Sequence, residues 1–109
     1  ELRDPELYNR RGVIRNFEAY PETLEGDFFG LKAFRNDDSP EARRVLELLT
    51  DLHCYWMREL DIDGFRVDAV KHLRPEFIRT FCSRIREYAY RLGKKNFFVF
   101  GELVGPDAL

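Results

Sequence analysis

Long apolar runs, runs of one charge and cysteine are all scarce in this sequence of 109 residues. No stretch approaches the roughly 18 apolar residues of a membrane-spanning helix, and the opening Glu1-Leu2-Arg3-Asp4 is not a signal peptide. We therefore expect a soluble chain with no membrane partner. The sequence leaves its compartment open, with the cytoplasm slightly favoured.

The charges are balanced, because 18 lysines and arginines stand against 20 aspartates and glutamates, and neither sign forms a long run. Nucleic acid binding needs a concentrated positive field, so we expect no nucleic acid partner. The two cysteines, Cys54 and Cys82, lack the spacing of a metal or redox pair and fall on apolar faces of expected helices. We expect buried, reduced thiols, with a disulfide as the alternative.

The chain has enough apolar material for one core, because 44% of its residues are hydrophobic and 15% are aromatic. Residues 1–38 scatter proline, glycine and aromatic residues without a regular period, so we expect irregular structure there, with a short turn of helix or strand near Phe28 and Phe29. Ser39-Pro40-Glu41 then has the composition of a helix start. An apolar stripe predicts an amphipathic helix that ends near Leu60, with the stripe formed by Val45, Leu48, Leu49, Leu52, Tyr55 and Trp56.

A strand, a second helix and a second strand are expected next. Residues 61–64 predict a turn, and the alternation over 65–70 predicts a strand. Residues 75–92 have helical spacing, and Gly93 supplies the stop. The run 97–100 is almost continuously apolar, as in a strand covered on both faces of a parallel sheet. Helix, strand, helix and strand in this order predict an α/β fold with parallel strands.

Two carboxylates, Asp68 and Glu102, fall near the expected carboxyl ends of these strands, where active sites of parallel α/β proteins lie. Neighbouring strands are about 4.8 Å apart, so the carboxylates can approach the separation of about 5–5.5 Å found in retaining glycosidases. Arg66 shares a strand face with Asp68 and can keep it ionised, whereas Glu102 follows four apolar residues and has no neighbouring base in sequence, as suits a general acid. A structural ion pair between Arg66 and Asp68 inside the sheet is the alternative.

The stretch Gly64-Phe65-Arg66-Val67-Asp68-Ala69-Val70-Lys71-His72 resembles the fourth-strand motif of the α-amylase family of glycoside hydrolases (glycoside hydrolase family 13), and Phe100-Gly101-Glu102 resembles its fifth-strand motif. The order, the spacing and the intervening helix agree with the family over about residues 39–105. The resemblance implies that residues 39–109 are part of a (β/α)8 TIM barrel. It also implies that residues 1–38 are the end of a loop domain inserted in that barrel.

The resemblance implies a role for each residue of the candidate site. Asp68 would be the nucleophile that forms a covalent β-glycosyl intermediate, Glu102 the general acid and base, and Arg66 the residue that orients Asp68. Lys71 and His72 would face the sugar that becomes the leaving group or the acceptor. A solvated strand-to-helix loop is the alternative for these two residues.

This sequence departs from the family in two ways. The third catalytic carboxylate, on the seventh strand, has no counterpart up to Leu109, so we expect the 109-residue chain alone to be inactive. Its strands would also lack the neighbours that they have in a barrel, so we expect the chain to self-associate through exposed sheet edges. Many members also bind calcium through an aspartate in a segment that here reads Leu31-Lys32-Ala33-Phe34, and the alanine side chain offers no oxygen. We expect no metal and no other cofactor, and we expect Asp27, Asp37 and Asp38 to be surface charges.

The sequence therefore predicts part of a retaining glycosidase or transglycosylase that acts on α-glucosidic bonds, with an α-glucan or oligosaccharide as its substrate. A non-catalytic amylase-like barrel that serves as a scaffold or interaction domain is the alternative, and the presence of both Asp68 and Glu102 disfavours it. An unrelated barrel enzyme that uses the same strand ends is a third interpretation, which the length of the match over 64–72 disfavours.

Overall fold

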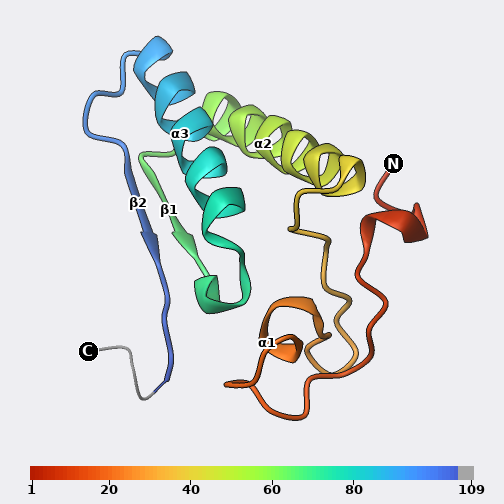
Figure 1. The fold of residues 1–109 in the computed structure, drawn as a ribbon. Helices are drawn as coiled ribbons and strands as arrows, with labels where there is room; N and C mark the ends of the chain where they lie inside the picture. Colours follow the sequence, from red (N-terminus) through yellow and green to blue (C-terminus); the bar gives the residue numbers. More distant parts are fainter. Residues whose placement is uncertain (106–109) are drawn as a thin grey trace.

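The structure, a computed structural model, describes residues 1–105. Its elements in chain order are the 3₁₀ helix η1 (Pro5–Leu7), α1 (Glu22–Glu25), α2 (Pro40–Leu60), β1 (Gly64–Val67), the 3₁₀ helix η2 (Val70–His72), α3 (Pro75–Arg91) and β2 (Phe98–Gly101). From α2 onward, helices and strands alternate, and the strands are parallel (Figure 1). The predicted α/β fold class is therefore confirmed.

The start of α2 agrees with the sequence prediction. Ser39 Oγ accepts a hydrogen bond from the Ala42 N–H at 3.1 Å, and Asp37 accepts one from the Ser39 N–H at 3.1 Å. Pro40 follows in the first turn, where a backbone N–H would have no partner within the helix, so the N–H that proline lacks costs no hydrogen bond. At the other end of the helix, Asp61 adopts a left-handed backbone with φ of 52° and stops the helix.

The apolar stripe of α2 is only partly buried among the described residues. Val45 lies in the core, whereas Leu52, Tyr55 and Trp56 are exposed. The helix is apolar on more than one side, and its other buried positions, Ala42, Leu46, Thr50 and Met57, define a face that is rotated away from the predicted stripe. The side chains of Leu52, Tyr55 and Trp56 thus form a second apolar face that residues 1–105 leave uncovered.

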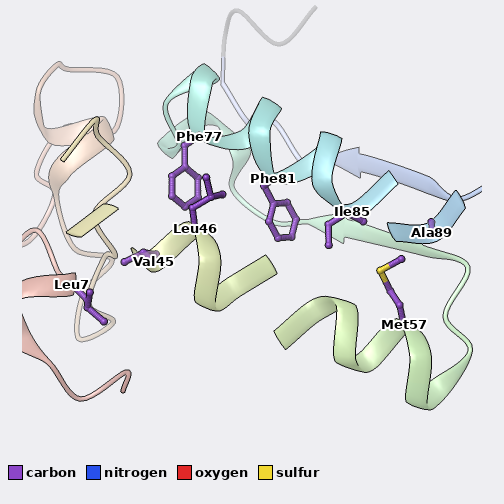
Figure 2. Packing of buried hydrophobic residues seen from close by; sticks show 8 residues of the cluster. All are labelled: Leu7, Val45, Leu46, Met57, Phe77, Phe81, Ile85 and Ala89. Carbon is purple, nitrogen blue, oxygen red and sulfur yellow. The ribbon is translucent and has the colours of Figure 1, made fainter. Parts of the chain in front are cut away.

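The core lies between α2 and α3, and Figure 2 shows the side chains of both helices pointing toward each other across it. Ile85 and Ala89 of α3 are fully buried there, together with Met57 of α2. Burying one large apolar side chain stabilises a fold by about 1.5–3 kcal/mol. Cys54 and Cys82, on the same two helices, are free and half-buried, and burial raises the pKa of both thiols.

β1 and β2 pair in parallel, with Gly64 opposite Phe98 and Arg66 opposite Phe100. Gly64 is required by this close approach, because a Cβ atom there would meet the carbonyl oxygen of Phe98 at 2.4 Å. Phe65 packs against the helix core on one face of the sheet. Phe98 and Phe100 are 65% and 47% exposed on the other face, because α2 and α3 both lie on the same side (Figure 1). The run 97–100 has the composition of a strand covered on both faces of a complete parallel sheet, and residues 1–105 cover only one of these faces.

β1 is shorter than the predicted strand over 65–70. It ends at Val67, because Ala69 adopts a left-handed backbone with φ of 51° and the chain then enters η2. The ladder still extends by one step, since the Glu102 N–H donates to the Val67 carbonyl at 2.8 Å and the Val70 N–H donates to the Glu102 carbonyl at 3.1 Å. The backbone therefore holds Glu102 beside the residues that follow β1.

Residues 1–38 contain η1, the four-residue helix α1 and isolated bridges that pair Tyr8 with Phe34, Val13 with Asp27 and Phe28 with Leu31. The segment is fastened to the rest of the chain by packing as well as by polar contacts, since Leu7 is fully buried in the core cluster. Among the described helices, none combines the length and the apolarity that crossing a membrane requires.

Candidate functional site

The ionisable residues of 61–72 separate to opposite ends of the sheet. At the amino end, Lys94 Nζ donates to the carboxylates of Asp61 and Asp63, at 2.5 and 2.8 Å. This group ties the start of β1 to the connection that follows α3. At the carboxyl end lie Arg66 and Asp68, at the edge of the sheet where active sites of parallel α/β proteins form.

Arg66 joins the two candidate carboxylates. Its Nη2 atom lies 3.3 Å from Asp68 Oδ1 and 3.1 Å from Glu102 Oε1. The strand register explains the arrangement, because Arg66 pairs with Phe100 and the residues two further on, Asp68 and Glu102, leave the sheet on the same face. Glu102 Oε2 also accepts a long hydrogen bond from the Ala69 N–H, at 3.4 Å. The structure thus brings together the three residues that the sequence singled out.

The two carboxylates share one base but differ in their exposure to solvent. Glu102 does have a base beside it, because the parallel register places Arg66 against it as well as against Asp68. Both carboxylates are open to solvent, with 75% of the Asp68 side chain and 36% of the Glu102 side chain exposed. The ion pair is therefore not enclosed within a sheet interior in residues 1–105.

Asp68 is nevertheless held in its ionised form. Its hydrogen bond with the Glu102 carboxyl, followed by the positive charge of Arg66 and the Ala69 N–H, lowers the pKa of Asp68 below its usual range. An ionised carboxylate beside a second carboxyl group can attack an electrophilic carbon while its neighbour supplies or accepts a proton.

Lys71 lies on η2 and contacts both the irregular segment 1–38 and the residues that follow β2. Its Nζ atom donates to the Glu18 carboxylate and, at 3.2 Å, to the carbonyl of Val104. The Lys71 side chain is mostly buried, so the interpretation of a solvated loop does not fit it.

His72 also contacts the segment 1–38. Its Nδ1 donates a hydrogen bond to the Thr23 carbonyl at 2.6 Å. The ring meets Phe28 and Phe17 edge-on, with centroids 4.6 and 5.9 Å away. His72 is therefore half-buried in an aromatic contact, and it does not lie in a solvated loop.

Arg74 extends the same contact surface. Its Nη2 atom lies 3.2 Å from Glu25 Oε1, and its N–H donates to Asn36 Oδ1 at 2.9 Å. The stretch 71–74 therefore fastens the irregular segment to the end of β1 at several separate points.

Two cavities open beside Asp68, Lys71 and Glu102. The larger has a volume of about 430 Å³, and its lining is mainly apolar but includes Asp68. The smaller has a volume of about 250 Å³ and adjoins Glu102, and its wall contains Lys71 together with Phe17 and Glu18. Sequence reasoning missed Phe17 and Glu18, because the contact of Glu18 with Lys71 spans 53 residues and leaves no local signal.

Asp27 is not the surface charge that the sequence predicts, because it is only 1% exposed. Its Oδ1 accepts a hydrogen bond from the Ala33 N–H and its Oδ2 accepts one from Lys32 Nζ, both at 2.9 Å. Burial alone would raise the pKa of Asp27, but these two hydrogen bonds outweigh it and the pKa is lowered. Asp37 is half-buried at the start of α2, whereas Asp38 is exposed as predicted.

These residues do not fit a family-type calcium site. The ammonium of Lys32 already neutralises Asp27, and Ala33 offers a backbone N–H where a hard cation needs an oxygen. In residues 1–105, no group of three or more histidine, cysteine, aspartate or glutamate side chains is placed to hold a metal ion.

Alternating helices and parallel strands, with carboxylates at the strand ends, place this chain among the α/β proteins, a class that includes (β/α)8 barrels. Comparison with models of protein families gives no match. The α-amylase of Streptomyces lividans is 34% identical over 106 residues, which cover 97% of this chain and 11% of that protein. The cyclomaltodextrin glucanotransferase of Klebsiella oxytoca is 28% identical over 101 residues, or 93% of this chain and 15% of that protein.

The solved structure of another α-amylase is also similar to this chain. The α-amylase from Geobacillus thermoleovorans, in complex with acarbose, matches with a TM-score of 0.80 and 27% identity over 97% of this chain and 22% of that structure. This chain is therefore a homologue of the α-amylase family over nearly its whole length, and it corresponds to a fragment of the family's catalytic barrel. It spans between a tenth and a quarter of the length of these relatives.

Proposed function

We propose that this chain carries two catalytic residues of a retaining glycosidase or transglycosylase that cleaves α-glucosidic bonds in oligo- or polysaccharides. The observation that carries the proposal is the position of one Arg66 nitrogen, within 3.3 Å of both Asp68 and Glu102 at the ends of adjacent parallel strands. The α-amylase and the cyclomaltodextrin glucanotransferase among its relatives support an α-glucan as the substrate.

In the first step, an Asp68 carboxylate oxygen attacks the anomeric carbon of the sugar. The bond from that carbon to the leaving oxygen breaks, the electron pair stays on the oxygen, and Glu102 donates its proton there. In the second step, the oxygen of water or of another sugar attacks the same carbon, Glu102 takes its proton, and Asp68 leaves. Two displacements at one carbon retain its configuration.

The remaining residues have supporting roles in this proposal. Arg66 orients Asp68 and keeps it ionised, and Lys71 and His72 face the leaving or accepting sugar from η2. Residues 39–109 belong to the barrel and residues 1–38 to the end of an inserted loop domain, although 106–109 lie outside the described residues. A complete barrel takes about 250 residues, so the site is complete only in a longer protein that contains this chain.

The exchange Asp68→Asn in such a complete enzyme tests the nucleophile. The new side chain is nearly isosteric but cannot form the covalent intermediate, so kcat on soluble starch should fall by several powers of ten while the circular dichroism spectrum is unchanged. Asp63→Asn is a matched control in the same stretch, because Asp63 binds Lys94 at the opposite end of the sheet. Retention of more than about a tenth of kcat by the Asp68→Asn enzyme would contradict the assignment.

The exchange Glu102→Gln tests the general acid. Proton donation matters most for a poor leaving group, so hydrolysis of starch should suffer far more than hydrolysis of α-glucosyl fluoride, whose leaving group needs little help. Equal losses on the two substrates would indicate a binding role for Glu102. A folded enzyme without activity on either substrate would favour the non-catalytic scaffold.

A further inference from the structure

We propose that the ammonium group of Lys32 takes the place of a bound metal ion in the irregular segment, so that an internal ion pair with Asp27, and not calcium, holds this segment together. The inference concerns the fold of residues 1–38, so it does not depend on the proposed function. It starts from the poor fit of these residues to a family-type calcium site.

Asp27 lies where two other stretches of the irregular segment meet. Its backbone N–H donates to the Gly12 carbonyl at 2.8 Å, and its carbonyl accepts a hydrogen bond from the Ile14 N–H at 3.0 Å. Its side chain binds the other stretch, through the hydrogen bonds from Lys32 Nζ and the Ala33 N–H, both at 2.9 Å. Asp27 therefore ties the two stretches to each other.

The buried carboxylate of Asp27 needs a positive partner. The residue is only 1% exposed, and an ionised carboxylate away from water is stable only with an opposite charge and hydrogen bonds around it. Lys32 supplies the charge, whereas Ala33 supplies a neutral N–H. The single positive charge of Lys32 balances the single negative charge of Asp27, so the pair is neutral as a whole.

Calcium is less suited to this position than an ammonium group. The ion takes about six to eight oxygen ligands, and the side chain of Ala33 provides none. Within residues 1–105, acidic, histidine and cysteine side chains do not gather in threes around a common point that could hold a metal. A calcium ion on Asp27 would also meet the Lys32 ammonium, which lies 2.9 Å from Oδ2, and like charges this close repel each other.

The Lys32 side chain reaches Asp27 across a tight turn. The Leu31 N–H donates to the Phe28 carbonyl at 2.8 Å, and Phe29 between them has a left-handed backbone with φ of 55°. The side chain of Lys32 is 63% exposed, so its ammonium approaches the buried carboxylate from the solvent. Because Asp27 and Lys32 flank the turn, their ion pair fixes both of its ends.

The same turn borders the candidate site. Phe28 meets the ring of His72 edge-on, with centroids 4.6 Å apart. Phe28 and Lys32 also line the larger cavity, whose wall contains Asp68. The ion pair therefore also fixes the position of this wall.

The first test asks whether a metal ion uses Asp27. The unfolding temperature of the complete enzyme is measured by calorimetry in excess EDTA and in calcium chloride, for the unmodified protein and for Asp27→Asn. Any calcium bound elsewhere in the complete enzyme contributes equally to both proteins, so the rise in unfolding temperature that calcium causes should be the same in both. A smaller rise in Asp27→Asn would show a metal ion on Asp27 and would overturn the inference.

The second test removes the ammonium group and leaves Asp27 in place. Lys32→Met keeps the length of the side chain but leaves the buried carboxylate without its counter-ion, so the unfolding temperature in EDTA should fall by about 2–4 °C. Lys32→Arg keeps the charge and should lose less. Lys95→Met is the matched control, because Lys95 is exposed in the turn that follows α3, and it should unfold like the unmodified enzyme.

Equal unfolding temperatures for Lys32→Met and Lys95→Met would overturn the inference. Both tests measure stability and not activity, so their outcome is separate from that of the tests on Asp68 and Glu102.

Discussion

Gly101 lies directly against Val70, because a Cβ atom on Gly101 would come within 2.7 Å of Val70 Cγ1 and 3.0 Å of its Cβ. The last residue of β2 thus packs on the first residue of η2. The Val70 N–H also donates to the carbonyl of Glu102 at 3.1 Å. Together these contacts fix the position at which Glu102 leaves the sheet.

Gly101→Ala should therefore impair catalysis although residue 101 carries no reacting group. Overpacking of this kind costs about 1–3 kcal/mol, and displacement of Glu102 should lower kcat/KM about tenfold. Val70→Ala in the same enzyme removes the closest atoms and should restore part of the activity. Gly30→Ala is the control, since nothing lies within 4 Å of a Cβ atom there. Strictly additive losses in the double variant would contradict the contact as the cause.

Arg66→Met should move the acidic limb of the pH profile. Asp68 acts as an ionised group, and the Arg66 charge is one of the causes that lower its pKa. Removing the charge should raise that pKa, so activity should begin to fall at a higher pH in a plot of kcat/KM against pH. Arg66→Lys keeps the charge and should shift the limb less. An acidic limb that stays in place in the Met variant would show that Arg66 does not control the ionisation of Asp68.

Asp27→Ala should destabilise the fold in a pH-dependent way. The change leaves the Ala33 N–H without its side-chain acceptor, which should cost about 1–3 kcal/mol at neutral pH. Because folding lowers the pKa of Asp27, its ionised form stabilises the fold above the unfolded-state pKa, and this contribution is lost as the pH falls through the folded-state pKa. Unfolding temperatures of the two proteins should therefore converge in acid.

The exposed Asp38 provides the control for this measurement, and Asp38→Ala should unfold like the unmodified protein at every pH. A difference between Asp27→Ala and the unmodified protein that stays constant from neutral to acidic pH would contradict the ionic contribution of Asp27.

The 109-residue chain alone should self-associate and show no turnover on soluble starch. Phe98 and Phe100 leave one sheet face apolar and exposed, and unpaired strand edges favour pairing with another copy. Size-exclusion chromatography with light scattering over a dilution series should show dimers or larger species, and Phe98→Lys should shift them towards monomers. A compact monomer at micromolar concentration would contradict the prediction, as would starch cleavage that Asp68→Asn abolishes.

The sequence predicted elements whose signals are local. Ser39 and Pro40 mark the start of α2 by capping chemistry, and Gly93 stops α3 with φ of +81°. The end of β1 was not predictable, because Ala69 adopts a left-handed backbone that alanine seldom takes and that the pattern of strand residues does not reveal. The apolar run 97–100 is typical of a strand that a complete barrel covers on both faces, whereas residues 1–105 cover only one face of β2.

The contacts of the candidate site also differ in whether a local sequence pattern predicts them. Arg66 and Asp68 share a strand face by their spacing, so their contact follows from the sequence. The contact of Arg66 with Glu102 depends on the register between two strands, and no local spacing reveals it. The burial of Asp27 was not predictable, because its hydrogen-bond partners Lys32 and Ala33 form no sequence pattern that indicates a buried acid.

The attachment of the irregular segment to residues 71–74 has an evolutionary consequence. Glu18 pairs with Lys71 and Glu25 pairs with Arg74, so a change on one side removes a charge that the other side needs. A reversal of charge at one position should therefore be favoured by a reversal at its partner. Exchange of the irregular segment between homologues by recombination therefore keeps both ion pairs only where residues 71 and 74 carry matching charges, only a few residues from Asp68.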